Sequence, residues 1–78
     1  MRADDIRTMI EQGMPDADVT VSGADGVHFE AVIVSPSFDG QRTLQRHRMV
    51  YATLGEKMGG DIHALSLRTL TPHEASEI

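Results

Sequence analysis

Four histidines are the side chains of this 78-residue chain best suited to binding a metal ion: His28, His47, His63 and His73. The chain contains no cysteine, so it can form no disulfide and can supply no thiolate ligand of its own. A metal would therefore have to be held by histidine, aspartate or glutamate, or by ligands from a partner protein.

His63 lies between Ile62 and Ala64, in a segment that is expected to form a buried strand. A titratable ring there is either a structural residue, hydrogen-bonded to a neighbour, or a metal ligand. His28 lies two residues after the turn signal "SGADG", and a histidine beside a turn is commonly solvated. Asp25 lies inside this signal and is typical of a turn-forming residue.

The other two histidines have simpler interpretations. His47 belongs to an apolar helical stripe and is expected to be a buried, hydrogen-bonded structural residue rather than a ligand. His73 follows a proline in the last turn of the chain, is expected to be exposed, and is assigned no role.

Three arginines, Arg42, Arg46 and Arg48, lie close together in the second half of the chain. They form either a solvated helix face or a docking patch for an acidic partner or for nucleic acid. The chain as a whole carries seven basic and twelve acidic residues, a net charge of −5. That balance argues against a general nucleic-acid binder, because such proteins rely on neutralising phosphates.

These side chains must be positioned by a small set of predicted elements. Phe29, Ala31 and Ile33 alternate with other residues, and this period of two predicts a strand that pairs with the preceding segment as an antiparallel hairpin. Because the strand is apolar on most of both faces, it should be central. The predicted elements are a helix over 3–12, strands near 19–21 and 28–34, a helix from 43, a strand from 62 to about 69, and a helical turn from 71.

The helix from residue 43 is predicted to place one apolar stripe against the core, consisting of Leu44, His47, Tyr51, Leu54 and Met58. The sequence "TPHE" near the end of the chain predicts a helix start. In this interpretation Thr71 is the N-cap, Pro72 is the first helical residue and Glu74 completes a capping box.

The element order α-β-β-α-β-α predicts one α+β domain over residues 1–78, with a mixed three-stranded sheet covered by helices on one face. No nucleophile with its base, no carboxylate pair and no phosphate-binding loop is recognisable, so an enzyme is not expected. The N-terminal segment has no long apolar run, so neither a signal peptide nor a membrane span is expected, and the predicted compartment is the cytoplasm.

Three segments in order, "HFEAVIVSPSFDG", "RTLQRHRMVYATLGEKM" and "IHALSLRTLTPHE", resemble the BolA family over roughly residues 19–74. The turn "SGADGVHF" is most similar to the short bacterial branch called IbaG. The resemblance implies a class II KH-like fold. It also implies a monothiol glutaredoxin as partner, with which the protein shares a [2Fe-2S] cluster in iron–sulfur assembly, trafficking or iron sensing.

In the arrangement that the resemblance implies, the glutaredoxin and a glutathione each provide a thiolate, and the "IHAL" histidine, His63, is a ligand. The second ligand comes from the hairpin turn, where other branches carry Cys or His. This chain has Asp25 near that place, and a carboxylate is a hard donor that suits an iron–sulfur centre poorly. His28 is the nearest imidazole, so His63 and His28 are the predicted ligands and Asp25 is the weaker candidate. No cluster is expected in the isolated chain.

The alternative function is a DNA-binding transcriptional regulator that uses the KH-like fold and the segment Arg46-His47-Arg48. KH domains clamp the nucleic-acid backbone with a GXXG loop, and the glycines of "LGEKMGGD" do not have that spacing. The sequence leaves open a weak homodimer through an exposed sheet edge.

Overall fold

The computed structural model describes residues 1–62 and 64–77. The elements follow the predicted order α-β-β-α-β-α, with two short 3-10 helices in addition. Their bounds are α1 (Ala3–Gly13), β1 (Asp18–Ser22), β2 (His28–Val34), η1 (Pro36–Phe38), α2 (Thr43–Leu54), η2 (Gly55–Lys57), β3 (Ala64–Leu70) and α3 (Pro72–Ser76).

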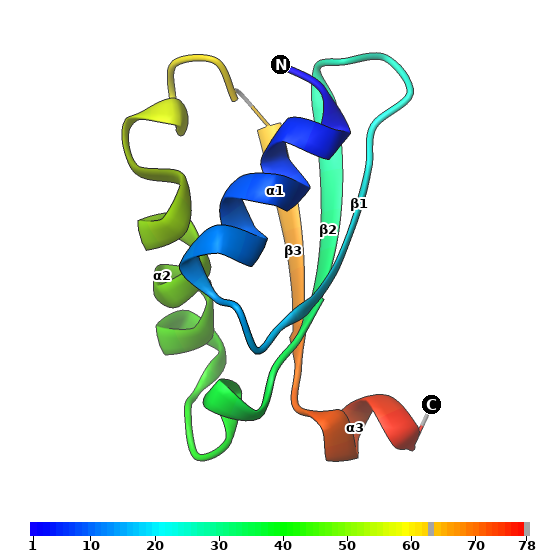
Figure 1. Ribbon diagram of the computed structural model, residues 1–78, viewed down its shortest axis with the longest axis vertical. Coiled ribbons are helices and arrows are strands. Elements are labelled where there is room, and N and C mark those ends of the chain that lie inside the picture. Colours follow the sequence, from blue (N-terminus) through cyan, green and yellow to red (C-terminus); the bar gives the residue numbers. More distant parts are fainter. Residues whose placement is uncertain (63, 78) are drawn as a thin grey trace.

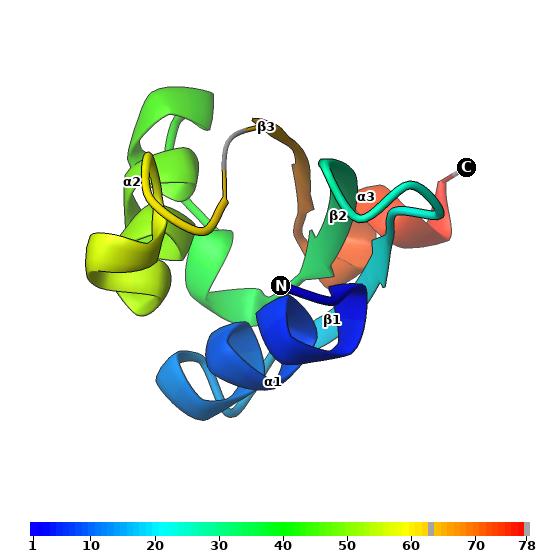
Figure 2. The ribbon, with the colours of Figure 1, turned by 90° about the horizontal axis from the view of Figure 1, so that it is seen from above.

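The three strands form one mixed sheet in the order β1-β2-β3 (Figure 1). β1 is antiparallel to β2, and β2 is parallel to β3. Helices α1 and α2 both lie over one face of this sheet, as the view along the strands shows (Figure 2). The predicted α+β class, the mixed three-stranded sheet and the central position of β2 are therefore confirmed.

The core lies between the sheet and the two long helices. Along β2, Phe29, Ala31 and Ile33 are buried while the residues between them are exposed, because successive side chains of a strand point to opposite faces. The same face of β3 contributes the partly buried Leu65 and Leu67. The remaining buried apolar residues are Ile6, Ile10, Met14, Phe38, Val50, Leu54 and Ile62.

The final strand begins later than predicted. Ile62 is fully buried, but it forms an isolated parallel bridge with Met58 instead of the first pair of β3. The pairing of β3 with β2 starts at Ala64, opposite His28, and ends at Leu70, opposite Val34. His63, the predicted ligand, lies outside the described residues.

The predicted core face of α2 is wrong. Leu44 is 62% exposed and Tyr51 is 37% exposed, and Val50, which was not predicted, is buried in their place. Leu54 is buried as predicted. His47 is only half-buried, and its ring meets the Tyr51 ring edge-on with 6.4 Å between centroids. Apolar residues occur on more than one side of this helix, so their spacing alone could not choose the side that packs against α1 and the sheet.

Close contact between α1 and α2 occurs where α1 ends. A Cβ atom added to Gly13 would lie 2.6 Å from Cγ2 of Thr53, which is too short for any real contact. The Thr53 hydroxyl donates a hydrogen bond to the carbonyl of Val50 at 2.6 Å, and this bond holds the side chain in place. Gly13 is therefore required by packing and not by its backbone angles.

Replacing Gly13 with alanine should destabilise the protein by about 1–3 kcal/mol, because the added methyl group overpacks the helix contact. Helix propensity alone predicts the opposite sign, since alanine is favoured over glycine by about 1 kcal/mol. Urea unfolding of Gly13→Ala measures the sign. In the background of Thr53→Ser, which keeps the hydroxyl and removes Cγ2, the loss should be smaller but should not vanish, because Cβ of residue 53 would still lie 2.8 Å from the added atom. A stabilised Gly13→Ala variant would show that the helices do not approach this closely.

Candidate functional site

The turn between β1 and β2 and the beginning of β3 lie at the same end of the sheet (Figure 1). This follows from the register, because His28, the first residue of β2, is paired in parallel with Ala64, the first residue of β3. In the sequence, Ala64 directly follows His63. The strand pairing thus brings the turn to the start of the segment in which the sequence predicts the main ligand.

Asp25 organises the turn through three hydrogen bonds. Its Oδ1 accepts the main-chain N–H groups of Val27 and His28, both at 2.9 Å. Its Oδ2 lies 2.8 Å from Nδ1 of the His28 ring. The hydrogen bond from the ring, followed by those from the main chain, lowers the pKa of the Asp25 carboxyl well below its ordinary value. The predicted turn-forming role of Asp25 is confirmed.

His28 presents its ring to solvent from the sheet face that α1 and α2 leave uncovered. Its side chain is 76% exposed, and Glu30 follows on the same face of β2. An open hollow of about 430 Å³ lies against this region and is lined by Ser22, Gly23, Ala24, Asp25, His28 and Glu30. A partner that enters the hollow can therefore reach the imidazole directly.

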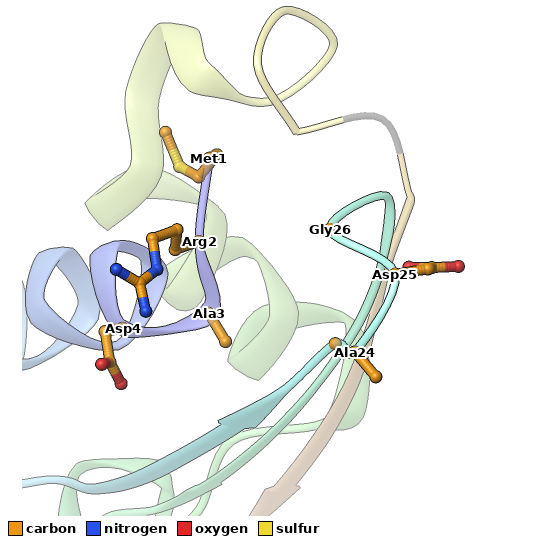
Figure 3. Close-up of a pocket in the computed structure, with 8 residues that line it drawn as sticks. Met1, Arg2, Ala3, Asp4, Ala24, Asp25 and Gly26 are labelled. Carbon is orange, nitrogen blue, oxygen red and sulfur yellow. The ribbon is translucent and has the colours of Figure 1, made fainter.

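A second hollow, of about 400 Å³, lies between the start of α1 and the same turn, and is lined by residues 1–4 and 23–26. Figure 3 shows the Asp25 carboxylate pointing away from Met1 and Arg2 on the α1 side. Gly23, which lines both hollows, lies against the ring of Phe29, and a side chain at this position would clash with the ring. The charged group of the turn is thus directed away from the α1 terminus.

Across residues 1–62 and 64–77, no three His, Cys, Asp or Glu side chains are grouped closely enough to hold a metal ion together. At this end of the sheet, Asp25 and His28 form a hydrogen-bonded pair of side chains of the types that can ligate metals.

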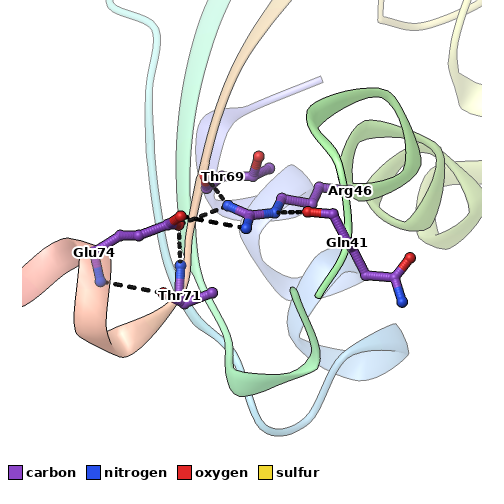
Figure 4. Close-up of polar contacts among 5 residues, drawn as sticks. All are labelled: Gln41, Arg46, Thr69, Thr71 and Glu74. Atoms are coloured by element: carbon purple, nitrogen blue, oxygen red, sulfur yellow. Dashed lines mark hydrogen bonds and ion pairs between the residues drawn. The ribbon is translucent and has the colours of Figure 1, made fainter. Parts of the chain in front are cut away.

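Arg46 has a structural role in place of the predicted docking role. Its side chain is only 13% exposed and forms a two-pronged ion pair with Glu74, at 2.6 and 3.3 Å (Figure 4). It also donates to the carbonyls of Gln41 and Thr69, at 2.8 and 3.3 Å. Its guanidinium carbon lies 5.8 Å from the centre of the Phe38 ring. Because these contacts engage the guanidinium group within the protein, little of it is accessible to a partner.

The ion pair joins α2 to the capping box of α3, which is formed as predicted. Glu74 Oε1 accepts the main-chain N–H of Thr71 at 2.8 Å, and the Thr71 hydroxyl accepts the N–H of Glu74 at 3.1 Å. Pro72 occupies the first helical turn. The hydrogen bond from Arg46, together with that from Thr71, lowers the pKa of Glu74 from 4.5 to about 2.

The other predicted site residues stay at the surface. Arg42 and Arg48 are exposed, so the docking prediction remains for these two. His73 is exposed as predicted, and its Nε2 lies 2.9 Å from Oε1 of Glu77. α3 lies at the end of the sheet opposite the β1–β2 turn (Figure 1). No helix within the described ranges has both the length and the apolar character needed to cross a lipid bilayer.

A family model described as BolA-like protein matches residues 10–74. The chain belongs to the BolA family. Among its relatives are BolA-like protein 1 of Homo sapiens, 35% identical over 92% of the chain, and DNA-binding transcriptional regulator BolA of Escherichia coli, 51% identical over 60%. The alignments span 59% and 45% of those relatives' own lengths. An uncharacterised protein of Acinetobacter guillouiae is 35% identical, over 95% of the chain and 89% of that protein.

Solved BolA structures show the same fold. A BolA homologue from Coxiella burnetii matches with a TM-score of 0.88 and 49% identity over 97% of both chains. Yeast Fra2 matches with a TM-score of 0.79 and 30% identity, over the whole chain and 87% of that protein. The BolA domain of SufE1 from Arabidopsis thaliana matches with 0.77 and 31%, over 92% and 93%. The Acinetobacter and Coxiella relatives fit the short bacterial branch that the turn predicts.

The capping box of this BolA domain should make its stability depend on pH in acid. Because the folded-state pKa of Glu74 is lowered, its stabilising contribution is fully present above pH 4.5 and is lost as the pH falls toward 2. Urea unfolding of wild type and Glu74→Gln should therefore differ at pH 6 and converge near pH 2. Glu77→Gln, at the exposed C-cap that follows α3, is the matched control and should change little at either pH. A gap between wild type and Glu74→Gln that stays constant with pH would contradict the assignment.

Proposed function

We propose that this protein is a non-enzymatic partner of a monothiol glutaredoxin and shares a [2Fe-2S] cluster with it. The cluster is the cargo of the complex, delivered or sensed in iron–sulfur assembly, trafficking or iron regulation. The observation that carries the proposal is the exposed imidazole of His28, held at the end of the sheet where β3 begins after the "IHAL" histidine, His63.

The donor chemistry of the turn fits such a cargo. Imidazole is a suitable ligand for iron beside thiolates, whereas carboxylate oxygens are hard donors. The Asp25 carboxylate already accepts three hydrogen bonds within the turn, while most of the His28 ring faces solvent. These contacts support His28 over Asp25 as the ligand from the turn. His63 remains the proposed ligand on the family motif alone.

Histidine ligation also suits a cargo that must be received and released. Imidazoles on one iron raise the reduction potential of a [2Fe-2S] cluster relative to all-cysteine ligation. A protonated imidazole cannot ligate, so binding depends on pH.

A second candidate function is DNA binding, which is favoured by the similarity to the DNA-binding transcriptional regulator BolA of Escherichia coli. In this chain the surface that could contact phosphates is small. Arg46 is engaged internally, and Arg42 and Arg48 are the exposed arginines of the predicted segment. The net charge of −5 opposes binding at a distance.

The cluster proposal predicts that the protein, mixed with a [2Fe-2S]-loaded monothiol glutaredoxin and glutathione, forms a coloured heterodimer. Its visible circular dichroism should differ from that of the glutaredoxin homodimer. His63→Ala should abolish the difference and leave the far-ultraviolet spectrum unchanged. His73→Ala, at the opposite end of the domain, is the control and should behave as wild type. Identical visible spectra with and without this protein would refute the proposal.

If the protein binds DNA, its affinity should fall steeply with salt. Removing two phosphate contacts with Arg42→Ala and Arg48→Ala should reduce the slope of log K against log salt by about 2. Fluorescence anisotropy with a duplex at several salt concentrations measures the slope. Gln45→Ala, on the same exposed part of α2, serves as the uncharged control. An unchanged slope in the double variant excludes this surface.

A further inference from the structure

We propose that Asp25 is a positioning residue that holds His28 in the tautomer whose Nε2 lone pair faces a partner's metal. The ligand half of this inference rests on the proposed function, whereas the tautomer is a property of the free protein. In this inference Asp25 orients the ligand His28 by a hydrogen bond and does not bind the metal itself. The family resemblance, by contrast, suggests a ligand at this place in the turn.

The first step is that the Asp25 carboxylate is fixed relative to β2. Oδ1 accepts two main-chain N–H groups, those of Val27 and His28, both at 2.9 Å. His28 is the first residue of β2 and is paired with Ala64 of β3. The carboxylate is therefore anchored to the sheet and cannot swing outward without breaking the turn.

The second step concerns the other carboxylate oxygen. Oδ2 lies 2.8 Å from Nδ1 of His28, which is hydrogen-bond distance. An ionised carboxylate only accepts hydrogen bonds, so Nδ1 must be the nitrogen that carries the hydrogen. A neutral imidazole has one protonated nitrogen, so the free lone pair is on Nε2.

The third step is accessibility. The His28 side chain is 76% exposed and lines the open hollow on the uncovered side of the sheet, together with Asp25 and Glu30. In metalloproteins, a ligating histidine usually donates its second N–H to a carboxylate or carbonyl, which fixes the ring orientation and strengthens the ligand. Asp25 and His28 already form that pair before any metal arrives.

Asp25→Asn is the isosteric test. The asparagine Oδ1 can still accept both main-chain N–H groups, so the turn should persist. Its amide N–H groups replace Oδ2 and face Nδ1, which must then accept a hydrogen bond. The variant should consequently shift His28 to the tautomer with hydrogen on Nε2, which blocks the nitrogen that faces solvent.

Long-range ¹H–¹⁵N NMR of the free protein reads the tautomer of the neutral His28 ring directly. Wild type should show hydrogen on Nδ1 of His28, and Asp25→Asn should shift the population toward Nε2. Asp39→Asn, which changes an exposed aspartate after η1, is the control and should leave the tautomer unchanged. Hydrogen on Nε2 in wild type, or no shift in Asp25→Asn, would overturn the inference.

Titration of [2Fe-2S]-loaded monothiol glutaredoxin with each variant tests the ligand half. Asp25→Asn should weaken formation of the heterodimer about 10- to 100-fold, and His28→Ala at least as much. If His63→Ala fails to bind while His28→Ala and Asp25→Asn bind as wild type, the inference is overturned and the proposed function stands. If wild type itself forms no heterodimer, the proposed function fails and so does the ligand role of His28, whereas the tautomer is still decided by the NMR measurement.

Discussion

The parallel pairing of β2 with β3 is the constraint on which the rest of the domain depends. Parallel neighbours cannot be joined by a tight turn, so the chain must cross from one end of the sheet to the other. α2 makes this crossing and thereby covers one face of the sheet beside α1 (Figure 2). The same pairing fixes His28 opposite Ala64, which brings the β1–β2 turn to the end of the sheet where β3 begins.

The two ends of the sheet differ in how their polar groups are used. At one end, Arg46, Glu74 and Thr71 satisfy one another and tie α2 to α3. At the other, Asp25 satisfies the main chain of the turn but leaves the His28 ring largely in solvent. A polar network closed on itself adds rigidity, whereas a ring with one unused nitrogen is available for chemistry.

Sequence reasoning succeeded where short-range physics decides the structure. The alternation of Phe29, Ala31 and Ile33 predicted β2 and its buried face, and Thr71 with Glu74 predicted the start of α3. In both cases the interacting groups lie within a few positions of one another. The order of these elements predicted the α+β fold class, and the solved relatives of the BolA family confirm it.

The failures share a long-range cause. The core face of α2 depends on where α1 and the sheet lie, so Leu44 and Tyr51 were placed inside although they are exposed. The ion pair of Arg46 with Glu74 joins residues from α2 and α3, and no local pattern marks it. The contact of Asp25 with His28 was missed for another reason. A spacing of three is equally compatible with a turn held by main-chain hydrogen bonds alone, and it does not show that the second carboxylate oxygen meets the ring.

The crossing through α2 also has a consequence for the order in which the chain can assemble. The β1–β2 hairpin closes over a short turn, so its entropic cost of closure is small. β3 can pair with β2 only after the whole intervening segment has been ordered, which makes it a contact of large sequence separation. The β1–β2 hairpin is therefore expected to form before β3 pairs with β2, because pairing β3 has the larger entropic cost.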